Sequence, residues 1–484
     1  MVMRDFLYTY SWGFWLLLHI CLSWYYAPHV SDDAFIFFRY AENWSDGLGP
    51  VWNQGERVEG YSSPLWLLIL ALGHQVGLPV PSSAKILGIG FGFAVVLLVG
   101  RLVKHVGCQE HRGWLMCGAS LTAGLHYWSP TGLETSMYAF LWCASLLALV
   151  ENRWTWAVAL LGVARPEGPF VLFFWFLADA VASNRIQWKR YVLVLLPTFC
   201  WLLFRWFYYG EVLPNTYYAK VGGDPWVRFT VGFQYIFWPF VCWLLIAALA
   251  IVERSKISSV LLLFIGLQLF VVSFGGGDWM TNGRMLIAIL LPLWAWVRIT
   301  PWQASTSVVL LFCLTKFWVP WGAVSALANG NQLRTLAFQE GQLYKASKVV
   351  SKAIRKNLPP NSTIALNHAG FLPYLLPDYR FIDLTGLNDK HIAHEVSGGL
   401  HQKYDSKYVL SREPDLIVFN SHTKPSARMR THYLDYWEGE TNLARQSLFL
   451  QNYARVAKSW ERQRHGGDSA YIILYIRKRI GFSQ

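Results

Sequence analysis

Charged residues are scarce in this sequence. Asp, Glu, Lys and Arg make up only 15% of its 484 residues, whereas soluble domains carry about a quarter. Hydrophobic residues make up 54%, and there are 26 Trp, 24 Tyr and 30 Phe. A soluble fold could not bury this much apolar and aromatic surface. The same figures exclude disordered, collagen-like and small disulfide-rich proteins. The composition therefore predicts a protein that crosses a membrane several times.

Paired cysteines are also lacking. The seven cysteines all lie in or beside hydrophobic segments, none lies in the polar last third of the chain, and no two form a Cys-x-x-Cys motif. This distribution argues against a disulfide framework and against a cysteine-ligated metal cluster. It predicts free thiols in apolar surroundings.

The net charge of +13 is unevenly distributed, because nine of these charges lie from residue 323 onward. A basic excess suits an anionic membrane surface or an acidic partner. Nucleic acid is the weaker interpretation, since most of the chain is apolar enough to lie in lipid.

Long hydrophobic runs fill the first two thirds of the chain. A helix needs roughly 20 apolar residues to cross a bilayer. About eleven segments are candidate spans: 12–29, 84–100, 113–128, 133–150, 154–164, 169–183, 191–208, 229–251, 257–274, 285–297 and 304–322. The shorter stretch 64–78 predicts an interfacial or half-inserted helix. The first run lacks a small-residue cleavage site, so we expect it to be retained as a helix.

Basic residues indicate the orientation of these spans. The Lys and Arg residues of the short loops fall on one side, which is then cytoplasmic. The opposite side receives the acidic loop 30–63 and the tail after residue 322. Long domains are translocated regardless of their charge, so the basic tail does not contradict this topology.

The tail has an ordinary soluble composition. We predict a transmembrane module over 1–322 and a small extracytoplasmic α/β or α+β domain over 323–484. Within the tail, 333–357 has a helical pattern, and Ser362–Asn367, Leu416–Phe419 and Tyr471–Ile476 have the pattern of strands. The dipeptides Pro359-Pro360 and Gly466-Gly467 separate these elements.

Six polar clusters all map to the predicted outer face. They are centred on Asp32-Asp33, on Glu56 to Ser63, on Gly132-Leu133-Glu134, on Arg165-Pro166-Glu167-Gly168, on Pro214 to Lys220, and on Gly275 to Arg284. Ionisable groups near membrane depth are costly and tend to line functional cavities. Their gathering on one side is the main functional signal in the sequence.

Each cluster has a structural and a functional interpretation. Asp32 and Asp33 can cap a helix, or serve as a general base or metal ligand. Arg165 and Glu167 can form a buried ion pair, or bind a lipid phosphate. Arg284 can extend to the membrane interface or reach such a phosphate.

The ordered set of motifs resembles the lipid-linked arabinofuranosyltransferases of the C-type glycosyltransferase superfamily. The resemblance rests on Asp32 to Tyr40, Asn53 to Trp66, the four later outer-loop motifs, and in the tail Asn367-His368-Ala369-Gly370 with Ile382 to Leu387. It covers most of the chain. It implies a polyprenyl-phosphate sugar donor, an active site at the outer rim of a multi-pass bacterial inner-membrane protein, and Asp32 or Asp33 as the catalytic base.

Sugar transfer from a lipid phosphate needs one carboxylate base and cations around the leaving group, since a phosphate leaves without prior protonation. Arg57, Arg165, Lys220 and Arg284 are the expected phosphate-binding residues. The expected sugar- or acceptor-binding residues are Glu59, Tyr61, Glu134, Glu167, Asn215, Tyr217, Asp278, Trp279 and His368. No cofactor is required, although a divalent cation on Asp32 or Asp33 is conceivable.

Other readings stay open at this point. The donor sugar can be arabinofuranose, mannose or aminoarabinose, and the acceptor can be a glycan or a protein, with type IV pilin the first expectation. A transporter or lipid-binding protein is the non-enzymatic alternative. Transporters often contain inverted repeats and binding sites at the bilayer midplane, and the sequence shows neither.

Overall fold

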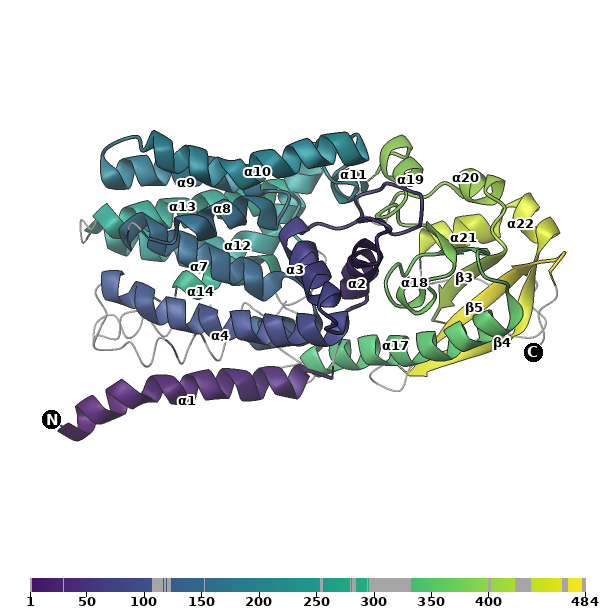
Figure 1. Cartoon of the computed structure of the whole chain (residues 1–484), viewed down its shortest axis with the longest axis horizontal. Helices are drawn as coiled ribbons and strands as arrows, with labels where there is room; N and C mark the ends of the chain where they lie inside the picture. The colour runs from purple at the N-terminus through teal and green to yellow at the C-terminus, as the bar shows by residue number, and fades with distance from the viewer. Residues whose placement is uncertain are drawn as a thin grey trace.

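The computed structural model has a helical part and a part that contains a sheet, at opposite ends of an elongated molecule (Figure 1). It describes residues 2–28, 30–106, 116, 119, 123–151, 153–252, 256–278, 280, 284–293, 295, 332–398, 402–422, 437–463 and 469–480. The N-terminus lies at the free end of the helical part and the C-terminus at the sheet end (Figure 1).

The helical part contains the apolar runs. Its longer helices are α1 (Val2–Tyr26), α4 (Val80–Val106), α7 (Thr135–Glu151), α9 (Gly168–Ser183), α10 (Trp188–Tyr209), α12 (Pro225–Val252) and α13 (Lys256–Phe274), and the short helix α8 (Thr155–Ala164) lies between α7 and α9 in the chain. Shorter elements are α3 (Pro64–Gln75), α6 (Ala123–Trp128), η2 (Ser129–Thr131), α11 (Asn215–Lys220), η3 (Arg284–Leu286) and α14 (Ile287–Leu293). The expected short helix at 64–78 is present as α3.

Two helices within the described residues, Val80–His105 and Trp188–Tyr209, have the length and hydropathy of a membrane span. The other apolar helices that meet the hydropathy criterion are shorter. The number of eleven spans therefore stays a prediction. The predicted span 304–322 and half of 113–128 lie outside the described residues.

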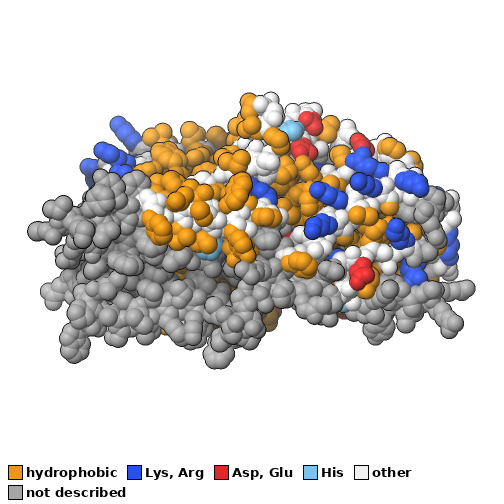
Figure 2. All heavy atoms as spheres, turned by 90° about the horizontal axis from the view of Figure 1, so that it is seen from below, with side chains coloured by type: hydrophobic (Ala, Val, Ile, Leu, Met, Phe, Trp, Pro, Cys, Tyr) orange, Lys and Arg blue, Asp and Glu red, His pale blue; other side chains and the backbone are white. Residues whose placement is uncertain are grey.

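Large apolar side chains point away from the helix core. On α9 and α10, Phe170, Phe173, Phe199 and Phe207 are all more than half exposed, and Phe207 reaches 78%. Figure 2 shows hydrophobic side chains gathered over the helical part, and Lys and Arg side chains over the sheet end and at the opposite end of the molecule. Exposed apolar faces of this size mark a contact with lipid or protein. They fit the membrane module predicted from composition.

One ion pair crosses between α10 and the loop that precedes α3. Arg205 donates from Nε to Oε2 of Glu59 over 2.6 Å and from Nη2 to Oε1 over 2.9 Å. Arg205 also donates to the carbonyl of Val212. Both charged side chains are buried. This bidentate geometry fixes the loop 49–61 on the helical part.

We expect Arg205→Met to lower the free energy of unfolding by about 3–5 kcal/mol, because Glu59 would keep a buried charge without its partner. The double variant Arg205→Met/Glu59→Leu should recover most of that loss. Thermal unfolding in detergent would measure both variants. Equal destabilisation by the single and the double variant would contradict the pairing.

The sheet end contains five strands in the order β2-β1-β3-β5-β4. They are β1 (Thr363–Leu366), β2 (Arg380–Asp383), β3 (Leu416–Ser421), β4 (Tyr453–Gln463) and β5 (Ser469–Arg477). The first three are mutually parallel, and β5 pairs antiparallel with both β3 and β4. All of these strands lie in the tail predicted to form an α/β or α+β domain.

Helices surround this sheet. They are α17 (Gln332–Asn357), α18 (Phe371–Leu375), α19 (Lys390–Glu395), α20 (Ser406–Ser411), α21 (Glu438–Ala444) and α22 (Ser447–Asn452). The predicted helix 333–357 and the three predicted strands are confirmed. β2 and β4 were not predicted, and Gly466-Gly467 lies outside the described residues. The exact boundary at residue 322 also lies in a part that the structure does not describe.

Helix α2 (Asp32–Ser45) joins the two ends of the molecule (Figure 1). Its Arg39 is 4% exposed and donates from Nε to the carbonyl of Trp52 over 2.6 Å. The same guanidinium donates to the carbonyls of Pro373, Leu376 and Tyr379 in the tail. Since buried carbonyls need donors, Arg39 connects the tail to the loop that contains Trp52.

Two asparagines add to this interdomain seam, by which we mean the contacts of residues 31–61 and 215–220 with residues 340–403. Asn53 donates to the carbonyl of Phe381 over 2.7 Å and accepts from its amide over 3.0 Å, as a neighbouring strand would. Asn215 donates to the carbonyls of Gly386 and Leu387, each over 2.9 Å. Most of these bonds go to backbone groups, so they fix the position of the tail accurately.

Candidate functional site

The candidate site lies where α2 begins, at the end of the helical part that meets the tail. The two acidic side chains in the first turn of α2 suit the positive end of the helix dipole. The helix ends at Ser45, before Asp46 and the left-handed Gly47 with φ 83°. The apolar middle of α2, including Phe35 and Phe38, is buried. These contacts hold Asp32 and Asp33 in place.

Asp32 binds the tail. Its Oδ1 accepts from the amide of Phe371 over 2.7 Å, and its Oδ2 accepts from the amide of Gly370 over 3.1 Å. Burial raises the pKa of Asp32 to about 7, against the lowering effect of these two amides. Both oxygens of this carboxylate therefore already have backbone partners.

Asp33 faces a different group of side chains. It is half-buried and lies within electrostatic range of Lys220 and Arg284, which come from α11 and η3. Lys220 is in turn within range of Asp278 and Arg165. The structure thus brings together one predicted base and three of the four predicted phosphate-binding cations.

Two of these cations are already paired with acids. Arg165 donates from Nη1 to Oε1 of Glu134 over 2.5 Å and from Nε to Oε1 of Glu167 over 2.7 Å. Arg284 donates from Nε to Oδ2 of Asp278 over 2.8 Å. The guanidiniums therefore have fixed orientations, and each retains N–H groups beyond these bonds.

Lys220 differs from the two arginines. Its ammonium forms no hydrogen bond or ion pair with any residue of the described ranges. Burial and the neighbouring guanidiniums lower its pKa, while Asp33 and Asp278 oppose that shift. A half-buried ammonium that makes no hydrogen bond to the described residues suits an anionic ligand.

Backbone breaks place these side chains. α8 ends at Ala164 and α9 begins at Gly168, and Arg165 lies in the break. A Cβ at Gly168 would overlap the carbonyl of Gly162, so the two helices can turn this closely only with glycine there. Gly276 and Gly277 have φ of 90° and 76° and lead the chain to Asp278.

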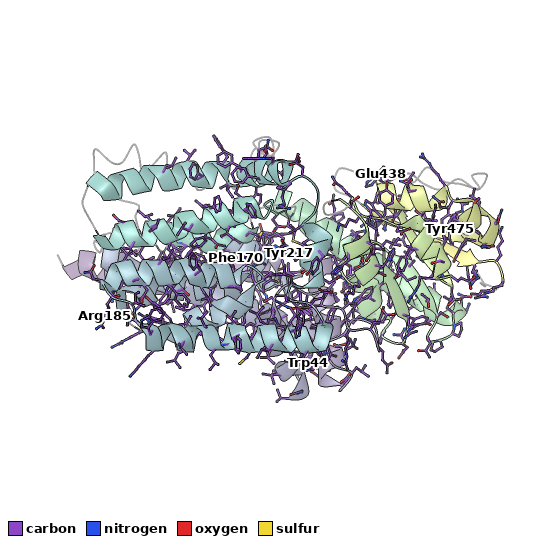
Figure 3. All side chains as sticks on the ribbon, turned by 90° about the horizontal axis from the view of Figure 1, so that it is seen from above. Trp44, Phe170, Arg185, Tyr217, Glu438 and Tyr475 are labelled. Atoms are coloured by element: carbon purple, nitrogen blue, oxygen red, sulfur yellow. The ribbon has the colours of Figure 1, made fainter. Side chains whose placement is uncertain are left out.

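The other predicted site residues lie elsewhere. Arg57 is exposed, and its Cζ lies 4.6 Å from the centroid of the Tyr208 ring. Glu59 pairs with Arg205. The Tyr61 hydroxyl is 2.9 Å from the hydroxyl of Tyr209. Asn215 binds the tail, Tyr217 is 38% exposed, and His368 is half-buried in the loop after β1. Trp279 lies outside the described residues. Figure 3 shows Tyr217 near the junction and Arg185 at the opposite end of the helical part.

Three contributors were not predicted. Glu340 of α17 accepts from the amide of Asp32 over 3.1 Å, and burial raises its pKa to about 8. Tyr235 of α12 lies within electrostatic range of Asp278 and Arg284. Arg205 interrupts an apolar helix, and such a charge is a sequence signal for a buried partner. Glu340 and Tyr235 carry no comparable signal.

No three His, Cys, Asp or Glu side chains converge as a metal-ligand set in the part of the chain that the structure describes. Asp32 and Asp33 point to different partners, since Asp32 is engaged by the loop after β1.

Comparison with known proteins gives two sequence relatives. Both are named terminal beta-(1->2)-arabinofuranosyltransferase. That of Mycobacterium tuberculosis is 26% identical over 243 residues, 44% of this chain and 38% of the relative. That of Corynebacterium glutamicum is 25% identical over 377 residues, 63% of this chain and 53% of the relative. The predicted resemblance is confirmed. The chain spans between about a third and about a half of these relatives.

A solved structure shows the same fold. It is ArnT from Cupriavidus metallidurans bound to undecaprenyl phosphate, with a TM-score of 0.52 and 12% identity, covering 100% of this chain and 99% of that one. This likeness supports the fold of a helical module followed by a sheet-containing tail. A domain family described as "Domain of unknown function (DUF8728)" matches residues 331–473, which include the whole of β1, β2, β3 and β4.

Proposed function

We propose that this protein is a membrane glycosyltransferase that takes arabinofuranose from a polyprenyl-phosphate donor. The observation that carries the proposal is the half-buried Lys220 ammonium, which lacks a hydrogen-bond partner within the described residues and lies within range of Arg165, Arg284 and Asp33. The names of the two relatives support the sugar, and the lipid phosphate bound by the structural neighbour supports the donor class.

In the proposed reaction an acceptor hydroxyl attacks the anomeric carbon of the donor sugar. Its proton passes to the Asp33 carboxylate as the new C–O bond forms. The bond between the anomeric carbon and the phosphate oxygen breaks, and its electron pair leaves with the lipid phosphate. Lys220, Arg165 and Arg284 stabilise the charge of that leaving group in a site of low water content.

Asp33 is the base in this scheme and not Asp32. The Asp32 carboxylate accepts two backbone amides of the tail, whereas Asp33 lies within electrostatic range of the cations that would hold the phosphate. A base must lie close to both the acceptor and the reacting carbon, which is adjacent to that phosphate.

The acidic partners of the cations have a second role in the proposal. Glu134 Oε2 and Thr135 Oγ1 are buried and have no hydrogen-bond partner in the described residues. A buried carboxylate oxygen without a donor is destabilising, and a sugar hydroxyl can supply that donor. Glu134 and its neighbour Thr135 are therefore the proposed contacts for the donor sugar.

We propose that the site faces the outside of a bacterial inner membrane. The basic loop residues Arg153, Arg185 and Lys189 belong to the side predicted to be cytoplasmic, and Arg185 lies at the end of the helices away from the tail (Figure 3). The tail and the acceptor are then extracytoplasmic. Type IV pilin is the proposed acceptor, to be compared directly with glycan acceptors.

A panel assay tests this function. Purified protein in nanodiscs would be incubated with labelled polyprenyl-phosphoryl arabinofuranose, mannose or aminoarabinose, each with a pilin or an arabinan acceptor. We expect transfer from the arabinofuranose donor alone. Transfer of another sugar would reassign the donor. Binding of the labelled lipid without any transfer would favour the lipid-binding alternative.

A further inference from the structure

The first turn of α2 makes capping contacts with two segments of the tail, helix α17 and the loop before α18. Ser31 precedes α2 but makes no side-chain capping bond, and the amide of Asp32 donates instead to Glu340 Oε2 over 3.1 Å. In return, the Asp32 carboxylate accepts from the amides of Gly370 and Phe371. The helix that begins with Asp32 and Asp33 is thus capped by a residue of the tail.

The two backbones meet at a glycine. A Cβ at Gly370 would overlap the backbone carbonyl oxygen of Asp32, and it would also approach the Asp32 carboxylate carbon at 2.8 Å. No relaxation of a flexible side chain can relieve a clash with backbone. Gly341, next to Glu340 in α17, has nothing within 4 Å of its would-be Cβ. Gly370 is therefore required for this contact and Gly341 is not.

We propose that Asp32, Glu340 and Gly370 are positioning residues, and that the tail sets the place of the Asp33 base through them. This inference rests on the proposed function. Asp33 follows Asp32 directly in the first turn of α2, so any shift of that backbone moves the base. A displacement of about 1 Å can cost about 10²-fold in rate. The tail is then part of the active site.

The rest of the interdomain seam supports this role. Arg39, about two helical turns after Asp32 on α2, binds three carbonyls of the tail. The Tyr374 hydroxyl of α18 donates to Glu42 Oε1 over 2.7 Å. α2 is therefore held by the tail along its length, and the caps at Asp32 determine where its first turn lies.

Substitutions at Gly370 and Gly341 provide the main test. We expect Gly370→Ala to lower kcat by about 10- to 100-fold, since the loop can no longer approach Asp32. Binding of polyprenyl phosphate should stay within about twofold, because Lys220, Arg165 and Arg284 belong to the helical part. Gly341→Ala is the matched control and should keep both kcat and binding. Equal kcat for the two variants would overturn the proposal.

Side-chain variants separate capping from acid–base chemistry. Glu340→Gln keeps an oxygen that accepts from the Asp32 amide and should keep most of the turnover, whereas Glu340→Ala should lower kcat as Gly370→Ala does. Asp32→Asn places an NH₂ group against one of the two tail amides and should cost about tenfold in kcat. If Glu340→Gln were as impaired as Glu340→Ala, Glu340 would act through its charge and the capping role would be wrong.

Hydrogen exchange distinguishes this inference from the proposed function. Amides of residues 32–36 and 371–375 should exchange faster in Gly370→Ala than in the wild type, whatever sugar the enzyme uses. If the wild type transferred sugar from none of the donors, the proposed function would be wrong. Faster exchange in Gly370→Ala would still show that the tail holds the first turn of α2 in place. Unchanged exchange in Gly370→Ala would overturn the inference even in an active enzyme.

Discussion

Asp33→Asn should lower kcat by about 10²–10⁴-fold, the usual contribution of a general base. Asparagine has nearly the same shape as aspartate, so the first turn of α2 and its caps stay in place. The amide cannot accept the proton of the acceptor hydroxyl at neutral pH. Single-turnover transfer with the purified protein and its labelled lipid donor would measure the loss. The midpoint of thermal unfolding should be nearly unchanged.

Asp32→Asn is the matched comparison for this variant, because the two acids are adjacent and chemically identical. We expect a far smaller loss at Asp32, which binds the amides of Gly370 and Phe371. A larger loss of kcat in Asp32→Asn than in Asp33→Asn would indicate that Asp32 is the base and Asp33 the positioning residue. Full activity in both single variants would remove general-base catalysis by this pair from the mechanism.

Lys220→Met should separate function from stability. Methionine fills a similar volume without a charge, and the Lys220 ammonium has no partner to leave behind in the described part of the chain. We therefore expect the unfolding temperature to hold or rise. Turnover should fall by about 10²–10³-fold, the range seen when one stabilising group is removed from a developing charge. Affinity for polyprenyl phosphate should fall with it.

Lys189→Met provides the control for the loss of one positive charge. Lys189 is exposed near the start of α10, in a loop predicted to be cytoplasmic. The Lys189→Met variant should change neither turnover nor lipid-phosphate binding. If Lys220→Met bound the lipid phosphate as tightly as Lys189→Met does, Lys220 would lie outside the phosphate site and the leaving-group scheme would need another cation.

The polar motifs could either bind a sugar or hold the tail on the helical part, and the sequence could not distinguish these two roles. Asn53, Asn215 and the loop of His368 to Gly370 belong to motifs expected in the sugar or acceptor site. In the structure, Asn53, Asn215 and Gly370 bind across the interdomain seam. Amides serve both purposes equally well, since they donate and accept hydrogen bonds to backbone or to sugar hydroxyls. Only the position of the partner decides between them.

The sequence by itself determined the class of the molecule and the residues worth examining. Apolar runs, sparse charge and ordered outer-loop motifs are local properties, so they predicted a helical membrane module, a tail with a helix and strands, and the family resemblance. The same local signals identified Asp32, Asp33, Arg165, Lys220 and Arg284.

The tertiary structure decided which of these residues act together. It placed Asp32 on the tail and Asp33 near the cations, and it brought Glu340 from 308 positions away to the Asp32 amide. It also left Lys220 without a partner in the described residues while both arginines gained acidic ones. Such pairings depend on long-range packing and burial. No periodicity or composition of a short segment contains that information.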